Sequence, residues 1–529
     1  PQSFIQSMGF AGNAAIGAGE LLALVYDATA ERDLSAPVEP GAPLSASGIE
    51  DGRIELIRHY RDQGYLYVRA FSHVSLSTDG LWADVTYTVE EGPQVRVQRV
   101  LVRGNRYTRE GIIRSRLTFR AGDLYRLEHA VSDQRSIATL GIFNSVRVKL
   151  VDEEHAAERK DLVADVVERN RQPIEVVPGI STANGPRLRM TYSHINVLGT
   201  ATAFTASLKL NRQIFFDLFG QYAAGLRSQY RSWEGLQQLT HALEREVRLG
   251  LRSPPIKALP FDPLFRLDLV DQRLNTVRYS LDSTTAILGV DAFTPWRIKV
   301  SVETQLGLTN LECTAAGKAC DTSLEVRRLQ GRPIDVGPRY TYKYGPQLVM
   351  DRRNNPLSPS RGYFASAKFT RAWGAAKPDP NAGFAPFSFN KLEGNLTGYA
   401  PLPLGIVLAV SGRAGTIMAH ESSVPVDERF YLGGRDTLRG YVESTLIPQD
   451  ACVVSGTTLP AGCQEVLRPS QLGSGIGPPL SLGGNTYMLL KTELRLPVRE
   501  SISIDLFVDL GNLWVDFTRV TRLALRVGT

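Results

Sequence analysis

The 529-residue sequence lacks features that mark several common classes of protein. It contains no run of 18 or more apolar residues, which is the length that a membrane-spanning helix needs. The formal net charge is only +6, and no block of like charges suggests an arm that binds nucleic acid. Neither absence excludes a transmembrane β-barrel, because alternating strands leave the mean hydropathy near zero, here −0.13.

Cysteine is scarce, and its positions are informative. The four cysteines form two close pairs, Cys313 with Cys320 and Cys452 with Cys463, in segments rich in small residues. Neither pair has the two-residue spacing typical of zinc ribbons. We therefore expect two local disulfides on external loops in an oxidising compartment, in preference to four free thiols.

Motifs for catalysis or cofactor binding are also lacking. The seven histidines are scattered, no serine lies in a G-x-S-x-G turn, and no G-x-x-x-x-G-K-S/T phosphate loop is present. The glycine-rich stretch 472–477 neither follows a buried strand nor opens a helix, so we interpret it as a loop. The sequence predicts no enzymatic activity, no metal and no cofactor.

The first third of the sequence contains an internal repeat. In each copy a helical stretch ends at a glycine, Gly64 or Gly141, after which an aromatic residue and an alternating strand follow. Each copy also has a Gly-Asn turn before its helices, at Gly12 and at Gly104. Glycine at a helix C-terminus supplies the left-handed conformation that ends the helix. The pattern predicts two modules with the order strand, helix, helix, strand, strand.

The predicted bounds of the two α+β modules are 4–92 and 93–170. The helix-ending glycines are 77 residues apart but the Gly-Asn turns are 92 apart, so the first module should contain an insertion. We place it at residues 30–48, a segment rich in proline, alanine, serine and glycine. The alternative is a single irregular α/β domain.

From residue 174 onward a period of two replaces the helical period. Long alternating runs of about 9–13 residues, with charges of both signs on the polar face, favour a transmembrane barrel of about a dozen strands over a soluble sandwich. We assign residues 174–529 to this antiparallel all-β barrel. Six aromatic residues near strand ends are expected to form an interfacial girdle: Tyr363, Phe364, Trp373, Phe387, Phe389 and Tyr399.

Three segments in this region carry recognisable motifs. Residues 351–363 form a turn signature whose key positions are Asp351, Pro356, Pro359 and Gly362. Proline ends the hydrogen-bond ladder of the strand, and glycine allows a tight turn. The second segment, 433–441, ends in the motif Leu438, Arg439, Gly440 and Tyr441. The third is residues 507–514, within a late alternating strand.

These three segments, in this order, resemble the BamA/TamA-type family of outer-membrane protein assembly factors, and the two repeats resemble its periplasmic POTRA domains. The resemblance covers nearly the whole chain. It implies a bacterial outer-membrane location and a barrel of 16 strands in the family. We expect the last strands to lie beyond Thr529, and a further segment to precede Pro1.

The resemblance also implies a role for Arg439. In the family the loop arginine bonds to acidic residues on the inward faces of the two strands that follow, which here are represented by Glu493 and Asp509. Both carboxylates fall on the polar face of their alternating strands, so both can point into a lumen. The alternative is an exposed arginine that makes a weak surface ion pair.

The resemblance implies that the protein inserts and folds other outer-membrane barrels. Its expected partners are unfolded outer-membrane proteins as clients, accessory lipoproteins or a TamB-like protein, and membrane lipid with lipopolysaccharide, but no nucleic acid. A BamA-like role and a TamA-like role are both open. A two-partner-secretion transporter, which also combines two POTRA domains with a barrel, is the alternative; a passive porin gives no reason for the repeats.

Overall fold

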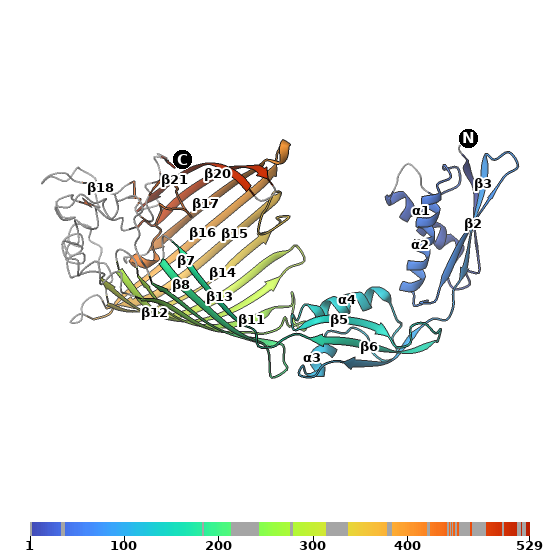
Figure 1. Ribbon diagram of the computed structural model, residues 1–529, viewed down its shortest axis with the longest axis horizontal. Coiled ribbons are helices and arrows are strands. Elements are labelled where there is room, and N and C mark those ends of the chain that lie inside the picture. Colours follow the sequence, from blue (N-terminus) through green and yellow to red (C-terminus); the bar gives the residue numbers. More distant parts are fainter. Residues whose placement is uncertain are drawn as a thin grey trace. The chain divides into compact units, whose positions relative to one another are not determined.

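The computed structural model describes most of the chain in two compact units (Figure 1). The first unit comprises residues 1–171 and 195–201, and the second comprises 172–194 and 202–529. The described residues are 3–32, 38–181, 185–212, 243–275, 279–313, 337–377, 383–419, 424–441, 444, 446, 448–449, 452–453, 466–467, 483–499, 502–515, 520 and 525–528.

The first unit contains the two predicted α+β modules. The first module has the elements β1 (Phe4–Ala11), α1 (Ala18–Arg32), α2 (Ala46–Asp62), β2 (Arg69–Leu76) and β3 (Trp82–Glu90). The second has β4 (Arg96–Arg103), α3 (Glu110–Arg114), α4 (Leu127–Ala138), β5 (Phe143–Leu150) and β6 (Arg159–Glu168). The predicted element order is confirmed in both. Because α1 continues to Arg32 and α2 begins at Ala46, the connection between them is shorter than the predicted loop of residues 30–48.

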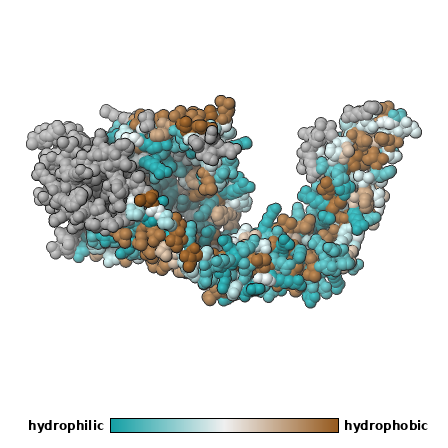
Figure 2. Space-filling view, viewed as in Figure 1, coloured by the Kyte–Doolittle hydropathy of each residue, from teal (hydrophilic) through white to brown (hydrophobic). Residues whose placement is uncertain are grey.

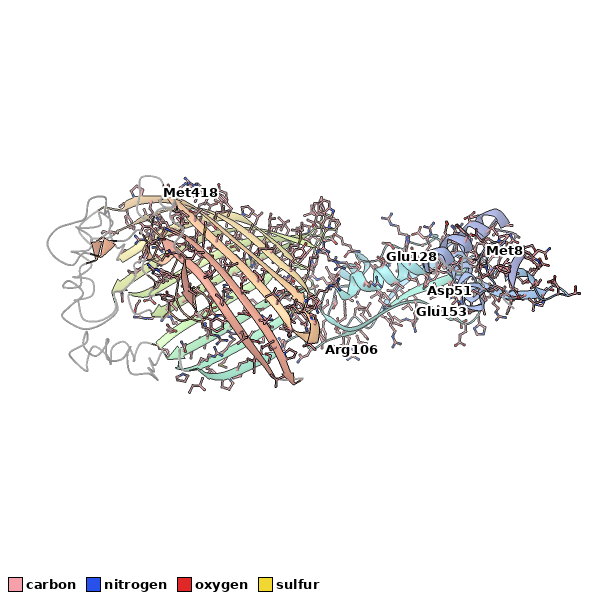
Figure 3. All side chains as sticks on the ribbon, turned by 90° about the horizontal axis from the view of Figure 1, so that it is seen from above. Met8, Asp51, Arg106, Glu128, Glu153 and Met418 are labelled. Carbon is pink, nitrogen blue, oxygen red and sulfur yellow. The ribbon has the colours of Figure 1, made fainter. Side chains whose placement is uncertain are left out.

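Both modules have the same sheet, with the last strand in the centre. The strand orders are β1-β3-β2 and β4-β6-β5; in each, the first strand runs parallel to the central strand and the other runs antiparallel. In each module, both helices contribute residues to one apolar core with the central strand. Figure 3 labels side chains from both modules, including Met8 of β1 and Glu128 of α4.

The Gly-Asn turns repeat in atomic detail. Gly12 and Gly104 have φ angles of 78° and 86°, which other residues rarely adopt. A Cβ atom at either position would also collide with a carbonyl oxygen of the central strand, that of Val89 or Val166. Both turns therefore require glycine for two independent reasons.

The residues beside these glycines, and the glycines that end the helices, also match between modules. The side-chain amides of Asn13 and Asn105 each donate to the carbonyl oxygen three residues further on, at 2.9 and 3.2 Å. Gly64 and Gly141 have positive φ angles of 89° and 71°, as the helix-ending pattern predicted. The repeat is therefore a repeat of local geometry as well as of element order.

Each module has its own apolar core between sheet and helices. Burying one large apolar side chain contributes about 1.5–3 kcal/mol, so each core stabilises its own module. The first core includes Ile5, Leu21, Leu56, Tyr60, Val85 and Tyr87. The second includes Ile113, Ile137, Leu150, Leu162 and Ala164.

The second unit is built on one large sheet, seen as the tilted strands of Figure 1. Its order is β22-β21-β20-β17-β16-β15-β14-β13-β12-β11-β10-β9-β8-β7, a 14-stranded antiparallel arrangement. Among the described residues no ladder joins β7 to β22. The strands are β7 (Ile174–Ser181), β8 (Gly185–Val197), β9 (Thr202–Arg212), β10 (Leu243–Arg252), β11 (Leu264–Asn275), β12 (Tyr279–Phe293), β13 (Ile298–Cys313), β14 (Gly337–Asp351), β15 (Gly362–Ala376), β16 (Ala385–Pro401), β17 (Val407–Ala419), β20 (Thr486–Arg499), β21 (Ile502–Trp514) and β22 (Arg526–Gly528).

Short elements lie in the connections of this unit. They are η1 (Pro403–Gly405), η2 (Val426–Glu428), and the paired strands β18 (Cys452–Val453) and β19 (Val466–Leu467). Within the described residues no helix is long and apolar enough to cross a membrane.

The two faces of the large sheet differ as the alternation predicted. On β13, Val302, Leu306 and Leu308 are more than half exposed on one face, although they are apolar. The opposite face carries Glu303, which accepts hydrogen bonds from arginine and lysine on other strands. Figure 2 shows hydrophilic side chains lining the hollowed side of the sheet and hydrophobic patches on its outer side. An exposed apolar outer face and a polar inner face are the arrangement of a transmembrane barrel.

The predicted aromatic girdle is wrong for most of its members. Phe387 and Phe389 are 6% and 1% exposed, because they face inward and are covered by loop residues. Phe364 and Tyr399 lie on the same inward face, opposite Thr397 and Gly362 in the strand register.

Only Tyr363 and Trp373 of the predicted girdle lie on the outer face, with exposures of 41% and 38%. Trp373 stacks there on two tyrosines that were not predicted, Tyr342 and Tyr344, with ring centroids 5.5 and 5.3 Å apart. The outer aromatic group is therefore formed by β14 and β15.

Candidate functional site

The connection between β17 and β20 packs against the polar face of the sheet. Its residues Phe430, Leu432 and Leu438 are buried in one apolar cluster with wall residues from five strands: Ala372, Ala376, Phe387, Phe389, Ile417, Leu489 and Leu513. Phe430 in this connection and Gly484, just before β20, exchange a pair of backbone hydrogen bonds of 2.9 Å. We call residues 424–441 the lumenal loop. Its apolar side chains explain why inward positions of these strands are apolar and buried.

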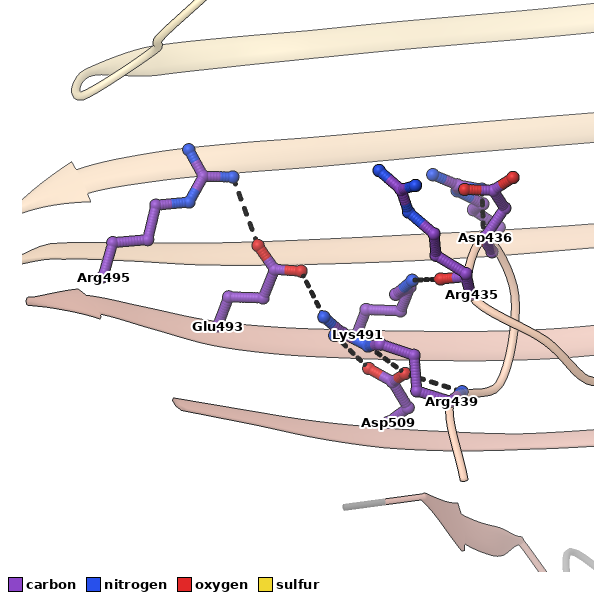
Figure 4. Close-up of polar contacts among 8 residues, drawn as sticks. Arg435, Asp436, Arg439, Lys491, Glu493, Arg495 and Asp509 are labelled. Carbon is purple, nitrogen blue, oxygen red and sulfur yellow. Dashed lines mark hydrogen bonds and ion pairs between the residues drawn. The ribbon is translucent and has the colours of Figure 1, made fainter. Parts of the chain in front are cut away.

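Arg439 of the lumenal loop binds two carboxylates on neighbouring strands (Figure 4). Its Nε and Nη2 donate to the two oxygens of Asp509 on β21, at 2.7 and 2.6 Å. Its Nη1 donates to Glu493 on β20 at 2.9 Å. The backbone N–H of Arg439 donates to Asp509 as well, at 3.1 Å. The structure thus brings together the three residues that the family resemblance paired.

The environment of this ion pair differs from that of a surface pair. The Asp509 side chain is fully buried, and that of Arg439 is 19% exposed. The guanidinium also lies over the ring of Phe507, 3.6 Å from its centroid. A planar guanidinium that binds a carboxylate with two parallel hydrogen bonds is held in one orientation, which lysine cannot reproduce.

The residues beside Arg439 fix the course of the backbone. Leu438 is fully buried in the apolar cluster, and Tyr441 packs against that cluster. Gly440 has a φ of 86°, so the chain turns there in a conformation that favours glycine. A Cβ atom on Gly528 of β22 would collide with the carbonyl oxygen of Arg439, so the loop passes directly against that strand.

The turn signature lies between β14 and β15. Asp351 accepts two hydrogen bonds from the Arg353 guanidinium, at 2.8 and 2.6 Å, and the carbonyl oxygen of Pro356 accepts a third at 3.2 Å. Pro359 is buried. Gly362 has a φ of 101°, and a Cβ there would collide with the backbone of the opposing strand end. The four signature residues therefore belong to one compact, internally bonded turn.

The disulfide prediction lies outside the described residues. Cys320 and Cys463 are not among them, and only the backbones of Cys313 and Cys452 are described.

Sequence reasoning missed a second set of charged contacts to the lumenal loop. Arg339 and Lys343 of β14 bind Asp427 and Glu428, which lie in the short helix η2, upstream of the arginine motif in the same loop. A usable signal was present: the two basic residues share one face of an alternating strand, and two adjacent acids lie in the loop.

Family models match both units of the chain. The Omp85 superfamily domain matches residues 196–524, which is well over half of the chain. A POTRA model, described as the surface antigen variable number repeat, matches residues 95–169.

Curated relatives share low identity over most of the chain. The outer membrane protein assembly factor BamA of Neorickettsia risticii is 21% identical over 496 residues, covering 90% of this chain and 55% of the relative. BamA of Neisseria meningitidis serogroup B is 21% identical over 461 residues, covering 85% and 51%. The chain spans about half the length of the curated relatives it matches.

A solved structure supports the fold. The crystal structure of BamA from Haemophilus ducreyi lacking POTRA domains 1–3 matches with a TM-score of 0.67 at 14% identity, covering 97% of this chain and 87% of that one. Together with the family models, these similarities show that the chain belongs to the Omp85 superfamily of BamA-type outer-membrane β-barrel proteins, whose POTRA domains lie in the periplasm.

Proposed function

We propose that this protein inserts and folds other β-barrel proteins in the outer membrane, and that its role is not enzymatic. The observation that carries the proposal is the combination, in one Omp85 chain, of POTRA modules with a loop held in the lumen by Arg439. The curated relatives are named outer membrane protein assembly factors, which supports the same role.

The POTRA modules would receive unfolded clients along their edge strands. In the described residues, β2 and β5 form a ladder only with the central strand of their sheets, which leaves one backbone edge of each open. On β2, Phe71 and Leu76 are 52% and 57% exposed. An extended client segment can add to such an edge through backbone hydrogen bonds while apolar side chains contact exposed ones.

The barrel would then template the client's strands within the membrane. A strand entering lipid must keep its backbone groups hydrogen-bonded, and pairing with a barrel strand provides those bonds. Arg439 would act as a brace that keeps the lumenal loop on β20 and β21 during this step. Partners in this role are unfolded outer-membrane proteins, with accessory lipoproteins or a TamB-like protein and with lipid and lipopolysaccharide around the barrel.

The experiment that tests the function is depletion of the full-length protein in its native host, followed by quantitative proteomics of the outer membrane and of secreted proteins. Joint loss of many barrel proteins with periplasmic stress is the expected result. Loss of one secreted protein, with other barrels intact, would overturn it and indicate a two-partner-secretion transporter. A rescue chain carrying Arg439→Ala separates the brace from the overall function.

A further inference from the structure

The lumenal loop makes a second set of buried ion pairs, with β14. The two terminal nitrogens of Arg339 donate to the two carboxylate oxygens of Asp427, at 2.6 and 2.5 Å. The side chains are only 4% and 13% exposed. The Nε of Arg339 donates to the hydroxyl of Thr341 at 3.2 Å, so the guanidinium is held on its own strand as well as by the loop.

The next loop residue, Glu428, is bound by two lysines from different strands. Its carboxylate pairs with Lys343 of β14. Its backbone carbonyl accepts a hydrogen bond of 3.1 Å from Lys391 of β16, whose ammonium also lies 4.6 Å from the ring centroid of Phe430. Adjacent loop residues thus engage three basic side chains on two strands.

Apolar packing fixes the loop at the same place. Val426 is 2% exposed and packs with Leu281 of β12 and Leu311 of β13. The hydroxyl of Tyr431 donates to the carbonyl oxygen of Val426 at 2.9 Å, which closes the short helix η2 against the following segment.

From these contacts we propose that Arg339 and Lys343 are positioning residues, which together with Asp427 and Glu428 anchor the start of the lumenal loop. The anchor lies on β14, four strands from β20 in the sheet order, whereas Arg439 anchors the loop's end on β20 and β21. Each anchor fixes one end of the lumenal loop, so that Arg439 meets Asp509. The consequence for assembly rests on the proposed function; the anchoring itself does not.

Electrostatics favours a positioning role over a purely stabilising one. Replacing a buried ion pair with apolar side chains is often neutral or stabilising, because two charges must be desolvated. Removing one partner is strongly unfavourable, because the other remains buried without a counter-charge. Charges of this kind specify where a segment docks, because every charge has a partner in only one register.

Asp427→Asn tests the anchor, and Glu303→Gln is its matched control. Glu303 also pairs with basic residues on the inner face of the sheet, with Arg266 at 3.0 Å and Lys368 at 3.1 Å, and is 15% exposed, but those partners lie on strands. Trypsin cleavage after Arg429 reports the loop's position, because Arg429 is 8% exposed and donates to the Val424 carbonyl. Cleavage is followed by peptide mass in isolated outer membranes, and heat-modifiable electrophoretic mobility reports whether the barrel is folded.

Asp427→Asn should accelerate cleavage after Arg429 by about a hundredfold in folded protein, whereas Glu303→Gln should leave it unchanged. The swapped pair Arg339→Asp with Asp427→Arg should restore slow cleavage, which a loss of general stability would not explain. Unchanged cleavage in folded Asp427→Asn protein, or equal acceleration in the control, overturns the anchor. If Asp427→Asn does not fold, the swapped pair decides: folded protein with slow cleavage supports the anchor, and failure to fold or fast cleavage overturns it. Assembly activity, scored separately, then tests the proposed function.

Discussion

Replacing Arg439 with alanine should destabilise the lumenal loop by about 3 kcal/mol. Breaking a buried ion pair by removing one partner costs about 3–5 kcal/mol, because the remaining charge stays desolvated. Here Asp509 is fully buried, but Arg439 and Glu493 are 19% and 22% exposed, which places the expected loss at the lower end. The backbone N–H at position 439 can still donate to Asp509, which limits the loss further.

Arg439→Lys should recover only part of this loss. Lysine retains the charge, but an ammonium cannot bind Asp509 with two parallel hydrogen bonds and reach Glu493 at the same time. The matched control is Arg435→Ala, which removes the same charge from the same loop. Arg435 is exposed, and within the described residues only its backbone carbonyl is engaged, by Lys491.

The assay is urea unfolding of the purified protein in a lipid bilayer, read by electrophoretic mobility and by tryptophan fluorescence. Assembly activity of the same variants is measured by their ability to replace the wild-type chain after depletion. The reasoning fails if Arg439→Ala and Arg435→Ala have the same free energy of unfolding. Unchanged assembly activity in Arg439→Ala would refute the brace even if stability falls.

Three further predictions concern other parts of the chain. Gly104→Ala should destabilise the second POTRA module by more than about 2 kcal/mol, because φ is positive there and a Cβ would collide with the Val166 carbonyl oxygen. The control is Gly111→Ala, which should be neutral or slightly stabilising because no atom lies near its Cβ. Hydrogen exchange of the module in the full chain distinguishes the two variants. Burial raises the pKa of Glu168, but hydrogen bonds from Thr108 and from the Tyr107 amide outweigh it and hold that pKa below its ordinary value. A carboxylate whose pKa is lowered by folding stabilises the protein above its unfolded-state pKa, and this stabilisation is lost as the pH falls through its folded-state pKa. Glu168→Gln should therefore cost about 1–2 kcal/mol of unfolding free energy at pH 7 and progressively less below about pH 4. Thermal unfolding of both proteins over a pH series measures this difference. Peptide mapping without reduction should find Cys313 joined to Cys320 and Cys452 to Cys463, and free thiols in native membranes would contradict this.

Local chemistry made much of the fold predictable from the sequence. The repeat was visible because its turns depend on glycines such as Gly12 and Gly104, whose backbone angles and close contacts no other residue satisfies. The inward and outward faces of the strands were visible because adjacent side chains point to opposite sides, as Val302 and Glu303 do.

Long-range contacts limited the prediction of the site. Phe387 and Phe389 were assigned to a girdle from their closeness to a strand end, although they share a face with Glu393, which pairs with Lys368 in the register. Apolar side chains are buried on that face because the lumenal loop, about forty residues further along the chain, packs against them. The contact of Arg339 with Asp427 went unpredicted for the same reason.

The lumenal loop also bears on how the large sheet unfolds. Strand ladders join only adjacent strands, so a sheet held by ladders alone would lose its strands one after another from an edge, like a linear array of repeats. The loop instead connects residues of β12, β13 and β14 to residues of β20 and β21, which lie far apart in the sheet order. Strands at these distant positions therefore share one set of contacts and should separate together. Cooperativity in this sheet depends on a segment that is not itself a strand.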